Sequence, residues 1–287
     1  MIVTERVDEV RRARWQDPTL SWGLVPTMGY LHEGHLSLVR AARPENERVA
    51  ASIYVNPTQF APDEDLESYP RDLERDLALL QAEGVDLVFT PSDDVMYPAG
   101  FQTYVSVEEV TQVLEGASRP THFRGVTTIV AKLFNVIRPT RAYFGQKDYQ
   151  QTVVLRRMVQ DLNFDVDLVV CPIVREADGL AMSSRNEYLT APQREAANVL
   201  YRALTAGAGL LDAGERDAAA VRNHMQQMIA AEPLATADYV SVAHPDTLEE
   251  LEQITERAVL SMAVFVGKTR LIDNVLWNAN ETGDVNV

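Results

Sequence analysis

Two histidines in the segment MGYLHEGH are well placed for chemistry on a charged ligand. His32 and His35 are three positions apart, so on a helical turn they would face the same side. Imidazoles and backbone amides at a helix N-terminus can stabilise the charge that develops on a phosphoryl group. Such a pair could also bind a metal, although no third ligand is evident nearby in the sequence. The segment therefore favours phosphoryl chemistry, and a metal site is the alternative interpretation.

A second polar segment, AMSSRN, offers groups that suit a polyphosphate. Ser183, Ser184 and Arg185 supply two hydroxyls and a guanidinium, which could hold the β- and γ-phosphates of ATP in a mobile loop that closes over them. The same composition is ordinary for a loop in which a serine caps a helix. Together with the histidines, the segment indicates an ATP site for attack on the α-phosphorus.

The segment FGQKDYQQ has the composition of a nucleotide site. Gly145 lets the backbone close on a base, Lys147 supplies a point charge for a phosphate, and Asp148 can accept from a ribose hydroxyl. Gln151, one helical turn beyond Lys147, is expected to project into the same cavity as Gln59 of VNPTQF. Since amides bond carboxylates, hydroxyls and amines, the two glutamines indicate a polar organic substrate. For Gln59, an exposed side chain on an Asn-Pro turn is the alternative.

Two further polar segments give weaker signals. In DEDLESYPRDLERD, Asp76 could help to hold Mg²⁺ on a polyphosphate, or the segment could be a solvated helix face. In LEGASRPTHFRGV, Glu115 is a candidate for a sugar or adenine contact, and Arg119 for a phosphate or loop-ordering contact. A surface salt bridge is an equally good interpretation of these two residues.

From Leu20 onward the sequence alternates between strand patterns and helix patterns, and these strands and helices must position the polar residues. We therefore predict an α/β fold: a Rossmann-like parallel sheet with crossover helices, whose ligands lie at the carboxyl ends of the strands. The predicted strands are 22–25, 49–55, 86–89, 141–144 and 166–170, and the predicted helices are 34–42, 70–83, 124–137 and 148–162.

Beyond Arg185 the pattern changes to Ala-rich helices followed by strands. We predict helices at 191–213 and 217–231 and strands at 237–243, 261–267 and 269–275, with a polar, disordered tail ETGDVNV. The predicted domains are 1–175, which binds ATP and the organic acid, and 176–287, a smaller α+β lid.

Composition limits the possible partners and compartments. A net charge of −16 disfavours nucleic acid as a partner, because such binding is dominated by Lys and Arg on phosphates. The single cysteine, Cys171, excludes an intrachain disulfide and has the apolar context of a buried side chain. No apolar stretch is long enough for a membrane span. Arg11, Arg12 and Arg14 could suggest a targeting signal, but Glu5, Asp8 and Glu9 interrupt the basic character of the N-terminus, which fits an exposed helix face better. We expect a cytoplasmic protein without membrane partners.

Several segments of the chain, taken together, resemble those of a known family. MGYLHEGH, VNPTQF, SYPRDLERD, EGASRPTHFRGV, FGQKDYQQ and READGLAMSSRN occur in an order and spacing similar to those of the pantoate-β-alanine ligases, or pantothenate synthetases, and GKTRLIDN resembles their C-terminal domain. This family belongs to the nucleotidylyltransferase superfamily with HIGH and KMSKS signatures. The resemblance covers about residues 1–277, and its departures, such as Tyr54 where the family often has Phe, touch no proposed catalytic role.

The resemblance implies a two-step reaction with Mg²⁺ and ATP. Pantoate attacks the α-phosphorus to give pantoyl adenylate and pyrophosphate, and β-alanine then displaces AMP; a homodimer is usual. The implied catalytic residues are His35 as proton donor, His32 and Lys147, and the implied contacts are Gln59 with pantoate and β-alanine and Gln151 with pantoate. The implied ATP-site residues are Met28, Gly29, Tyr30, Leu31, His32, Glu33, Gly34, His35, Gly145, Gln146, Lys147, Asp148, Val174, Met182, Ser183, Ser184 and Arg185.

Two alternatives share the same motif pair. A nucleotidylyltransferase would make a stable nucleotide product by the same attack and would need no amine acceptor. A tRNA-binding relative of the aminoacyl-tRNA synthetases would need a basic surface, which a net charge of −16 makes a poor match.

Overall fold

The computed structural model describes residues 1–62 and 64–280, which form two compact units. The first unit consists of Met1–Gln112, Gly116–Gly145 and Gln151–Cys171, and the second of Val113–Glu115, Gln146–Gln150 and the chain from Pro172 onward. The tail ETGDVNV, predicted to be disordered, lies outside the described residues.

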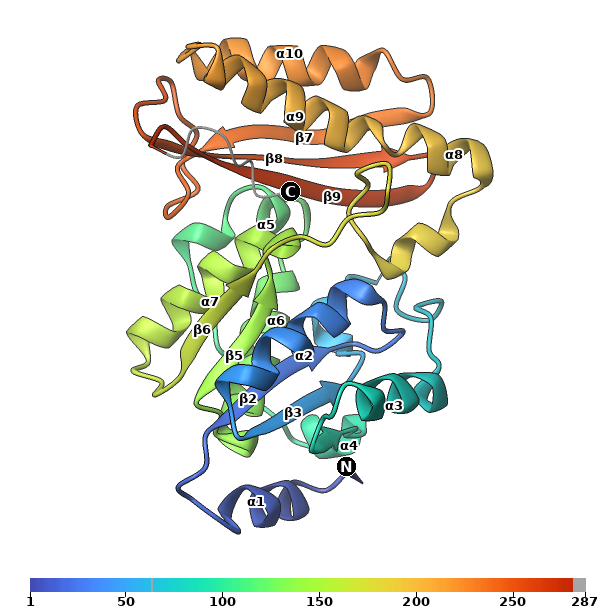
Figure 1. The fold of residues 1–287 in the computed structure, drawn as a ribbon, viewed down its shortest axis with the longest axis vertical. Helices are drawn as coiled ribbons and strands as arrows, with labels where there is room; N and C mark the ends of the chain where they lie inside the picture. The colour runs from blue at the N-terminus through green and yellow to red at the C-terminus, as the bar shows by residue number, and fades with distance from the viewer. Residues whose placement is uncertain (63, 281–287) are drawn as a thin grey trace. The chain divides into compact units, whose positions relative to one another are not determined.

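The first unit contains the predicted parallel sheet (Figure 1). Its six strands lie in the order β1-β4-β3-β2-β5-β6. Five of them agree with the predicted strands to within about two residues, the usual uncertainty of strand ends: β2 (Trp22–Thr27), β3 (Arg48–Ile53), β4 (Leu87–Phe89), β5 (Arg141–Gly145) and β6 (Asp167–Cys171). The edge strand β1 (Ile2–Thr4) was not predicted, because its apolar run is too short to show a period.

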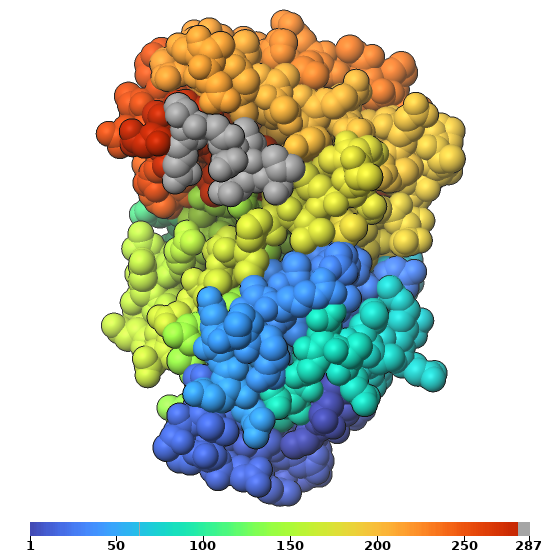
Figure 2. All heavy atoms as spheres, viewed as in Figure 1, coloured from blue at the N-terminus to red at the C-terminus, as the bar shows by residue number. Residues whose placement is uncertain are grey.

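Both faces of this sheet are covered by helices, which is why its strands are apolar at successive positions. Leu24 of β2 packs with α1 (Val7–Trp15), α6 (His122–Ile137) and α7 (Tyr149–Asp161), whereas the next residue, Val25, packs with α2 (Glu33–Glu45) and α3 (Leu73–Ala82). Figure 2 shows α2 in blue beside the blue-green α3 on one face of this unit. α3 begins three residues later than predicted, because Asp72 caps its N-terminus.

The strand order places a topological switch point beside β2. The chain runs from β2 to β3 and β4 on one side and then returns to β5 and β6 on the other. In open α/β sheets, ligands bind at the carboxyl ends of the strands where the order reverses. MGYLHEGH follows β2, and Gly145 is the last residue of β5, so the predicted segments follow the two strands that flank this point.

The first unit also has short elements that no period predicts: η1 (Pro57–Gln59), α4 (Asp93–Met96) and η2 (Glu109–Thr111). Cys171 is 6% exposed, as its apolar context indicated. The expectation that Arg14 lies on an exposed helix face is wrong. Its side chain is 9% exposed, and its Nε donates to the carbonyl of Arg138 at 3.1 Å, where α6 ends in the left-handed conformation. Arg14 therefore satisfies a helix-end carbonyl.

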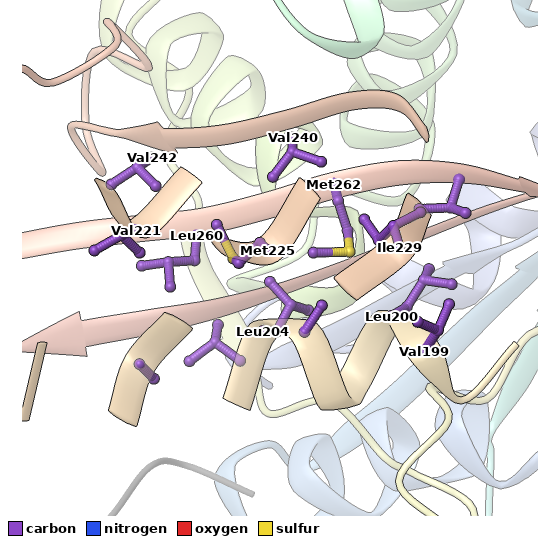
Figure 3. Close-up of a cluster of buried hydrophobic side chains, with 14 of the residues drawn as sticks. Val199, Leu200, Leu204, Val221, Met225, Ile229, Val240, Val242, Leu260 and Met262 are labelled. Atoms are coloured by element: carbon purple, nitrogen blue, oxygen red, sulfur yellow. The ribbon is translucent and has the colours of Figure 1, made fainter. Parts of the chain in front are cut away.

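The second unit contains a three-stranded antiparallel sheet in the order β7 (Ala235–Ala243), β8 (Arg257–Val266) and β9 (Thr269–Asn278), which confirms the smaller α+β fold. α9 (Val199–Asp212) and α10 (Ala218–Ala230) pack on it, with Leu204 and Met225 among the side chains that meet Leu260 and Met262 (Figure 3). The helix predicted at 191–213 is divided into α8 (Ala191–Ala196) and α9.

The remaining short elements are α5 (Glu115–Ser118), η3 (Gln146–Asp148) and η4 (Ser184–Tyr188). Within residues 1–62 and 64–280, no helix is both long and apolar enough to cross a membrane.

Candidate active site

The turn between β2 and α2 brings the two histidines together. α2 begins at Glu33, directly after its N-cap His32. Gly29 and Tyr30 have φ values of 85° and 51°, a left-handed conformation that turns the chain sharply and that glycine adopts without strain. The ring centroids of His32 and His35 are 4.1 Å apart. The spacing therefore correctly predicted that these side chains share one side of the helix start.

Hydrogen bonds within this turn determine which nitrogen of each neutral imidazole carries the proton. The amide of Gly34 donates to His32 Nδ1 at 3.1 Å, and the amide of His32 donates to His35 Nδ1 at 3.3 Å. A ring nitrogen that accepts a hydrogen bond is unprotonated, so the proton lies on Nε2 in both rings. The capping arrangement thus makes both Nε2 atoms hydrogen-bond donors.

Asp76 of α3 holds the backbone of the same turn. Its Oδ2 accepts from the amide of Tyr30 at 2.7 Å, and its Oδ1 accepts from the amide of Leu31 at 2.8 Å. The amide of Gly29 donates to Thr27 Oγ1 at 3.3 Å. Burial raises the pKa of Asp76 above its ordinary value, although both amide bonds favour the charged form. These amides therefore stabilise the turn itself.

The prediction that Asp76 helps to hold Mg²⁺ is not supported by this geometry. Its side chain is 1% exposed and faces backbone amides, whereas protein-bound Mg²⁺ keeps several waters in an octahedral shell. Within residues 1–62 and 64–280, no group of three or more His, Cys, Asp and Glu could hold a metal ion, so the metal alternative for the histidines gains no support either. A carboxylate in an acidic helix has the same sequence signature whether its partner is a cation or a backbone amide.

Gln59 lies beside the histidine turn. Its Nε2 donates to Met28 Sδ at 2.9 Å, and its Oε1 accepts from Asn56 Nδ2 at 3.1 Å. Gln59 is half-buried, so the alternative of an exposed side chain on an Asn-Pro turn is not supported. Asn56 is 1% exposed and also donates to the carbonyl of Gly125 at 3.1 Å. The sequence marked Asn56 only as a turn residue, and its burial is what identifies it as a support for Gln59.

A glycine of α6 allows the helix to approach the Gln59 segment closely. A Cβ on Gly125 would lie 2.5 Å from the carbonyl oxygen of Thr58 and 2.6 Å from Gln59 Cα. Contacts this short are not tolerated between real atoms, so any larger residue would displace η1 or α6. The close packing of α6 against Gln59, a proposed substrate contact, therefore requires glycine at position 125.

Arg119 and Glu115 take part in ion pairs. In the first unit, Arg119 bonds Glu64 at 2.6 and 2.7 Å, and its Nη2 also donates to the carbonyl of Gln59 at 3.4 Å. In the second unit, Glu115 is 6% exposed and bonds Arg270 at 2.7 and 2.8 Å. Neither pair is the exposed salt bridge that was the alternative, and the predicted contacts of both residues with ATP stay predictions.

Gln151 lies in the first turn of α7 and is half-buried. Its predicted contact with pantoate, and a cavity shared with Gln59, stay predictions. The adjacent Gln150, which belongs to the second unit, has a structural role instead. Its side chain accepts from the amide of Glu115 at 2.9 Å and donates to the carbonyl of Val113 at 2.8 Å.

Lys147 lies in η3 of the second unit. Its Nζ is 3.8 Å from Asp148 Oδ1, and the side chains of the two residues are 21% and 48% exposed. Both side chains therefore reach solvent and could contact a ligand. A residue of β9 holds the backbone of η3, because Asn274 Nδ2 donates to the carbonyls of Gln146 and Lys147.

The predicted phosphate loop, Met182 to Arg185, follows a turn that is held by hydrogen bonds. The amide of Met182 donates to the carbonyl of Val174 at 3.0 Å, which closes a turn around Gly179. Ser183 caps η4 by accepting from the amide of Arg185 at 3.3 Å, so the capping role considered as an alternative is present. Ser184 is 6% exposed, whereas Met182, Ser183 and Arg185 are half-buried.

The sequence analysis gave no role to the polar pair Asp273 and Asn274 of β9, which close the segment GKTRLIDN. Both are 2% exposed within the strand TRLIDNVLWN. A signal was present, because two adjacent polar residues interrupt an apolar strand and must find partners when buried. The pattern could not identify these partners, because they lie far away in the sequence.

Comparison with known proteins gives one consistent family. The model of the pantoate-β-alanine ligase family matches residues 2–276. A pantothenate synthetase of Moorella thermoacetica is 61% identical over 262 residues, covering 91% of this chain and 93% of that protein. One of a Roseiflexus species is 61% identical over 281 residues, covering 97% of this chain and 100% of its own.

Solved structures agree with this result. The crystal structure of pantothenate synthetase from Thermus thermophilus matches with a TM-score of 0.92 and 50% identity, covering 96% of this chain and 98% of that one. A pantoate-β-alanine ligase from Francisella tularensis, crystallised with β-γ ATP and β-alanine, matches with a TM-score of 0.78 and 34% identity over 99% of both chains.

Proposed function

Because the chain belongs to the pantoate-β-alanine ligase family, we propose that it condenses pantoate with β-alanine to pantothenate at the expense of ATP. The observation that carries the proposal is the family match over residues 2–276, together with a histidine pair that presents two Nε2–H donors at the start of α2. The relative crystallised with β-γ ATP and β-alanine supports the same substrates.

The reaction needs two displacements and no protein nucleophile. A carboxylate oxygen of pantoate attacks the α-phosphorus, the bond to the β-phosphate breaks, and pyrophosphate leaves. The amine of β-alanine then attacks the acyl carbon of pantoyl adenylate, the bond from carbon to the phosphate oxygen breaks, and AMP leaves as the amine loses a proton. The protein contributes positioning and charge stabilisation.

In the first unit, the proposed roles follow from the hydrogen bonds of the histidine turn. The amides of Gly29, Tyr30 and Leu31 already donate inside the protein. We assign the phosphate contacts to Nε2–H of His32 and His35, because the hydrogen bonds accepted by Nδ1 leave the proton on Nε2, where it can stabilise charge as it develops. Gln59, oriented by Asn56, is assigned to the carboxylate and amine of the two organic substrates.

In the second unit, Lys147 is assigned to a phosphate as a point charge and Asp148 to a ribose hydroxyl. Ser183 and Arg185, half-buried in the supported turn, are assigned to the terminal phosphates. Val174, Met182 and Ser184 complete this set of proposed ATP contacts. The Francisella relative holds a nucleotide and β-alanine, which supports such a site in this fold.

Three further parts of the proposal rest on the family. Mg²⁺ would enter as Mg-ATP, held by substrate phosphates and several waters, as is usual for nucleotide-bound Mg²⁺. We expect a homodimer in the cytoplasm. Sedimentation analysis that gives the mass of a single 32.0 kDa chain at micromolar concentration would overturn the dimer.

The test of the overall function omits one substrate at a time and measures pyrophosphate and AMP separately. Pyrophosphate should form with ATP and pantoate alone, whereas AMP release should require β-alanine. A nucleotidylyltransferase would instead retain the nucleotide in a stable product and ignore the amine. The family match favours the ligase over that alternative.

Mass spectrometry of the protein after incubation with ATP and pantoate tests the absence of a protein nucleophile. The expected spectrum is that of the unmodified chain. An acyl or adenylyl adduct on any residue would contradict direct attack of pantoate on ATP.

A further inference from the structure

Two buried polar side chains on β9 have no assigned part in substrate binding. Asp273 and Asn274 are each 2% exposed, between Ile272 and Val275. A buried polar group is costly unless its hydrogen bonds are satisfied, so its partners identify what it supports. The partners of Asn274 are residues implied to bind ATP, and the partner of Asp273 lies next to one.

Asn274 holds the backbone of two successive residues in η3. Its Nδ2 donates to the carbonyl of Gln146 at 3.0 Å and to the carbonyl of Lys147 at 2.9 Å. Its Oδ1 accepts from Gln146 Nε2 at 3.3 Å. These bonds use both protons of the amide and restrict the peptide units on either side of the Lys147 Cα, from which the ammonium projects.

Asp273 holds a second segment through Arg175. The carboxylate bonds Arg175 at 2.7 and 3.0 Å, and the side chains of this pair are 1% and 6% exposed. Arg175 also donates to the carbonyl of Gly179 at 3.0 Å and forms a β-bridge with Ala181, directly before Met182. The same pair therefore supports the turn that leads into the proposed phosphate loop.

We propose that Asn274 is a positioning residue for the first step of the reaction, which fixes the backbone that presents Lys147, while Asp273 fixes the turn before Met182 through Arg175. Successive side chains of a strand point to opposite faces, so one strand can support two separate segments. The proposal rests on the proposed function, because it assumes that Lys147 acts on a phosphate of ATP.

The experiment compares Lys147→Ala, Asn274→Ala and the double variant in pyrophosphate release from ATP and pantoate. We expect Lys147→Ala to lower the rate constant by about 10²- to 10³-fold, as for loss of one charge-stabilising donor. Asn274→Ala should lower it by about 10²-fold, the cost of a misplacement near 1 Å. If Asn274 acts through Lys147, the double variant should be no slower than Lys147→Ala within about twofold.

Two other variants distinguish positioning from stability. Asn274→Ser keeps a small donor and should fall between the wild type and Asn274→Ala. Asn278→Ala, on the same strand, removes an acceptor for the amide of Asn280 and should leave the rate unchanged. The midpoint of urea unfolding is measured for every variant.

Each outcome decides one part of the proposal. Wild-type protein without pantoate-dependent pyrophosphate release would overturn the proposed function and this inference with it. An active wild type with an unaffected Asn274→Ala variant, or with multiplicative effects in the double variant, would overturn the inference alone. Failure of both Asn274 variants to fold would assign the residue to stability rather than to positioning.

Discussion

The histidine turn of the first unit and η3 of the second are held by opposite chemistry. Asp76, a carboxylate, accepts from the amides of Tyr30 and Leu31, whereas Asn274, an amide, donates to the carbonyls of Gln146 and Lys147. In both cases one buried side chain bonds two successive peptide units. The difference shows that the anchor matches the backbone groups that a turn exposes.

The two anchors also differ in electrostatic cost. Burial raises the pKa of Asp76, because desolvation disfavours the charged form of its carboxyl group. Asn274 carries no charge and has no such cost. We expect the first turn to respond to loss of a hydrogen-bond acceptor and the second to loss of hydrogen-bond donors.

Substitution of the proposed catalytic groups should have the largest effects, which test whether both regions are equally required for the reaction. His35→Ala, like Lys147→Ala, should lower the rate of pyrophosphate release by about 10²- to 10³-fold, because each variant loses a group that stabilises developing charge. The matched controls His224→Ala and Lys268→Ala alter exposed residues and should retain the wild-type rate. A normal rate in either active-site variant would remove that region from the mechanism.

The next effect concerns the anchor of the first turn. Asp76→Asn retains one acceptor but places an NH₂ group against a backbone N–H, so it should reduce the free energy of unfolding by about 1–3 kcal/mol. Displacement of the histidines should also slow pyrophosphate release by about tenfold or more. Denaturant unfolding and initial rates measure the two effects, with the exposed Asp94→Asn as control. Unchanged stability and rate would show that the turn does not need its anchor.

Two helical glycines extend the comparison from hydrogen bonds to packing. Gly125→Ala should lower the free energy of unfolding by about 1–3 kcal/mol, because its Cβ would lie 2.5 Å from the carbonyl of Thr58. It should also raise the KM for pantoate, since η1 carries Gln59. Gly209→Ala in α9 meets nothing within 4 Å and should increase stability by about 0.5–1 kcal/mol through helix propensity. Equal effects of the two substitutions would contradict the packing argument.

The smallest effect is a pH dependence beside Gln59. Burial alone would raise the pKa of Glu64, but the hydrogen bond and charge of Arg119 outweigh it and hold the pKa below its ordinary value of 4.5. The pair should therefore contribute fully well above pH 4.5, and its contribution should be lost as the pH falls below that value. The difference in unfolding free energy between wild type and Glu64→Gln should be about 1 kcal/mol at pH 7 and shrink towards pH 3. A difference independent of pH would exclude the ionised pair as its cause.

Local patterns were sufficient to predict the parallel sheet. Successive residues of β2, such as Leu24 and Val25, pack on opposite faces, and this gives the apolar runs from which the strands were inferred. The spacing of His32 and His35 likewise predicted their shared orientation, because it depends only on the helix that follows.

Features that depend on distant partners could not be predicted. Asp76 resembled a metal ligand because the amides that it bonds belong to a turn elsewhere in the chain. Asn274 stands 127 positions from Lys147, and no period in the sequence connects them. The break between α8 and α9 was missed because Ala-rich sequence continues through it.

The most direct test of the account uses pantoate labelled with ¹⁸O in its carboxylate, together with ATP and β-alanine. Direct attack of the carboxylate on the α-phosphorus, followed by cleavage at the acyl carbon, leaves one carboxylate oxygen on the phosphate. The account predicts AMP that carries a single ¹⁸O and pyrophosphate that carries none. Unlabelled AMP, or label in pyrophosphate, would contradict it.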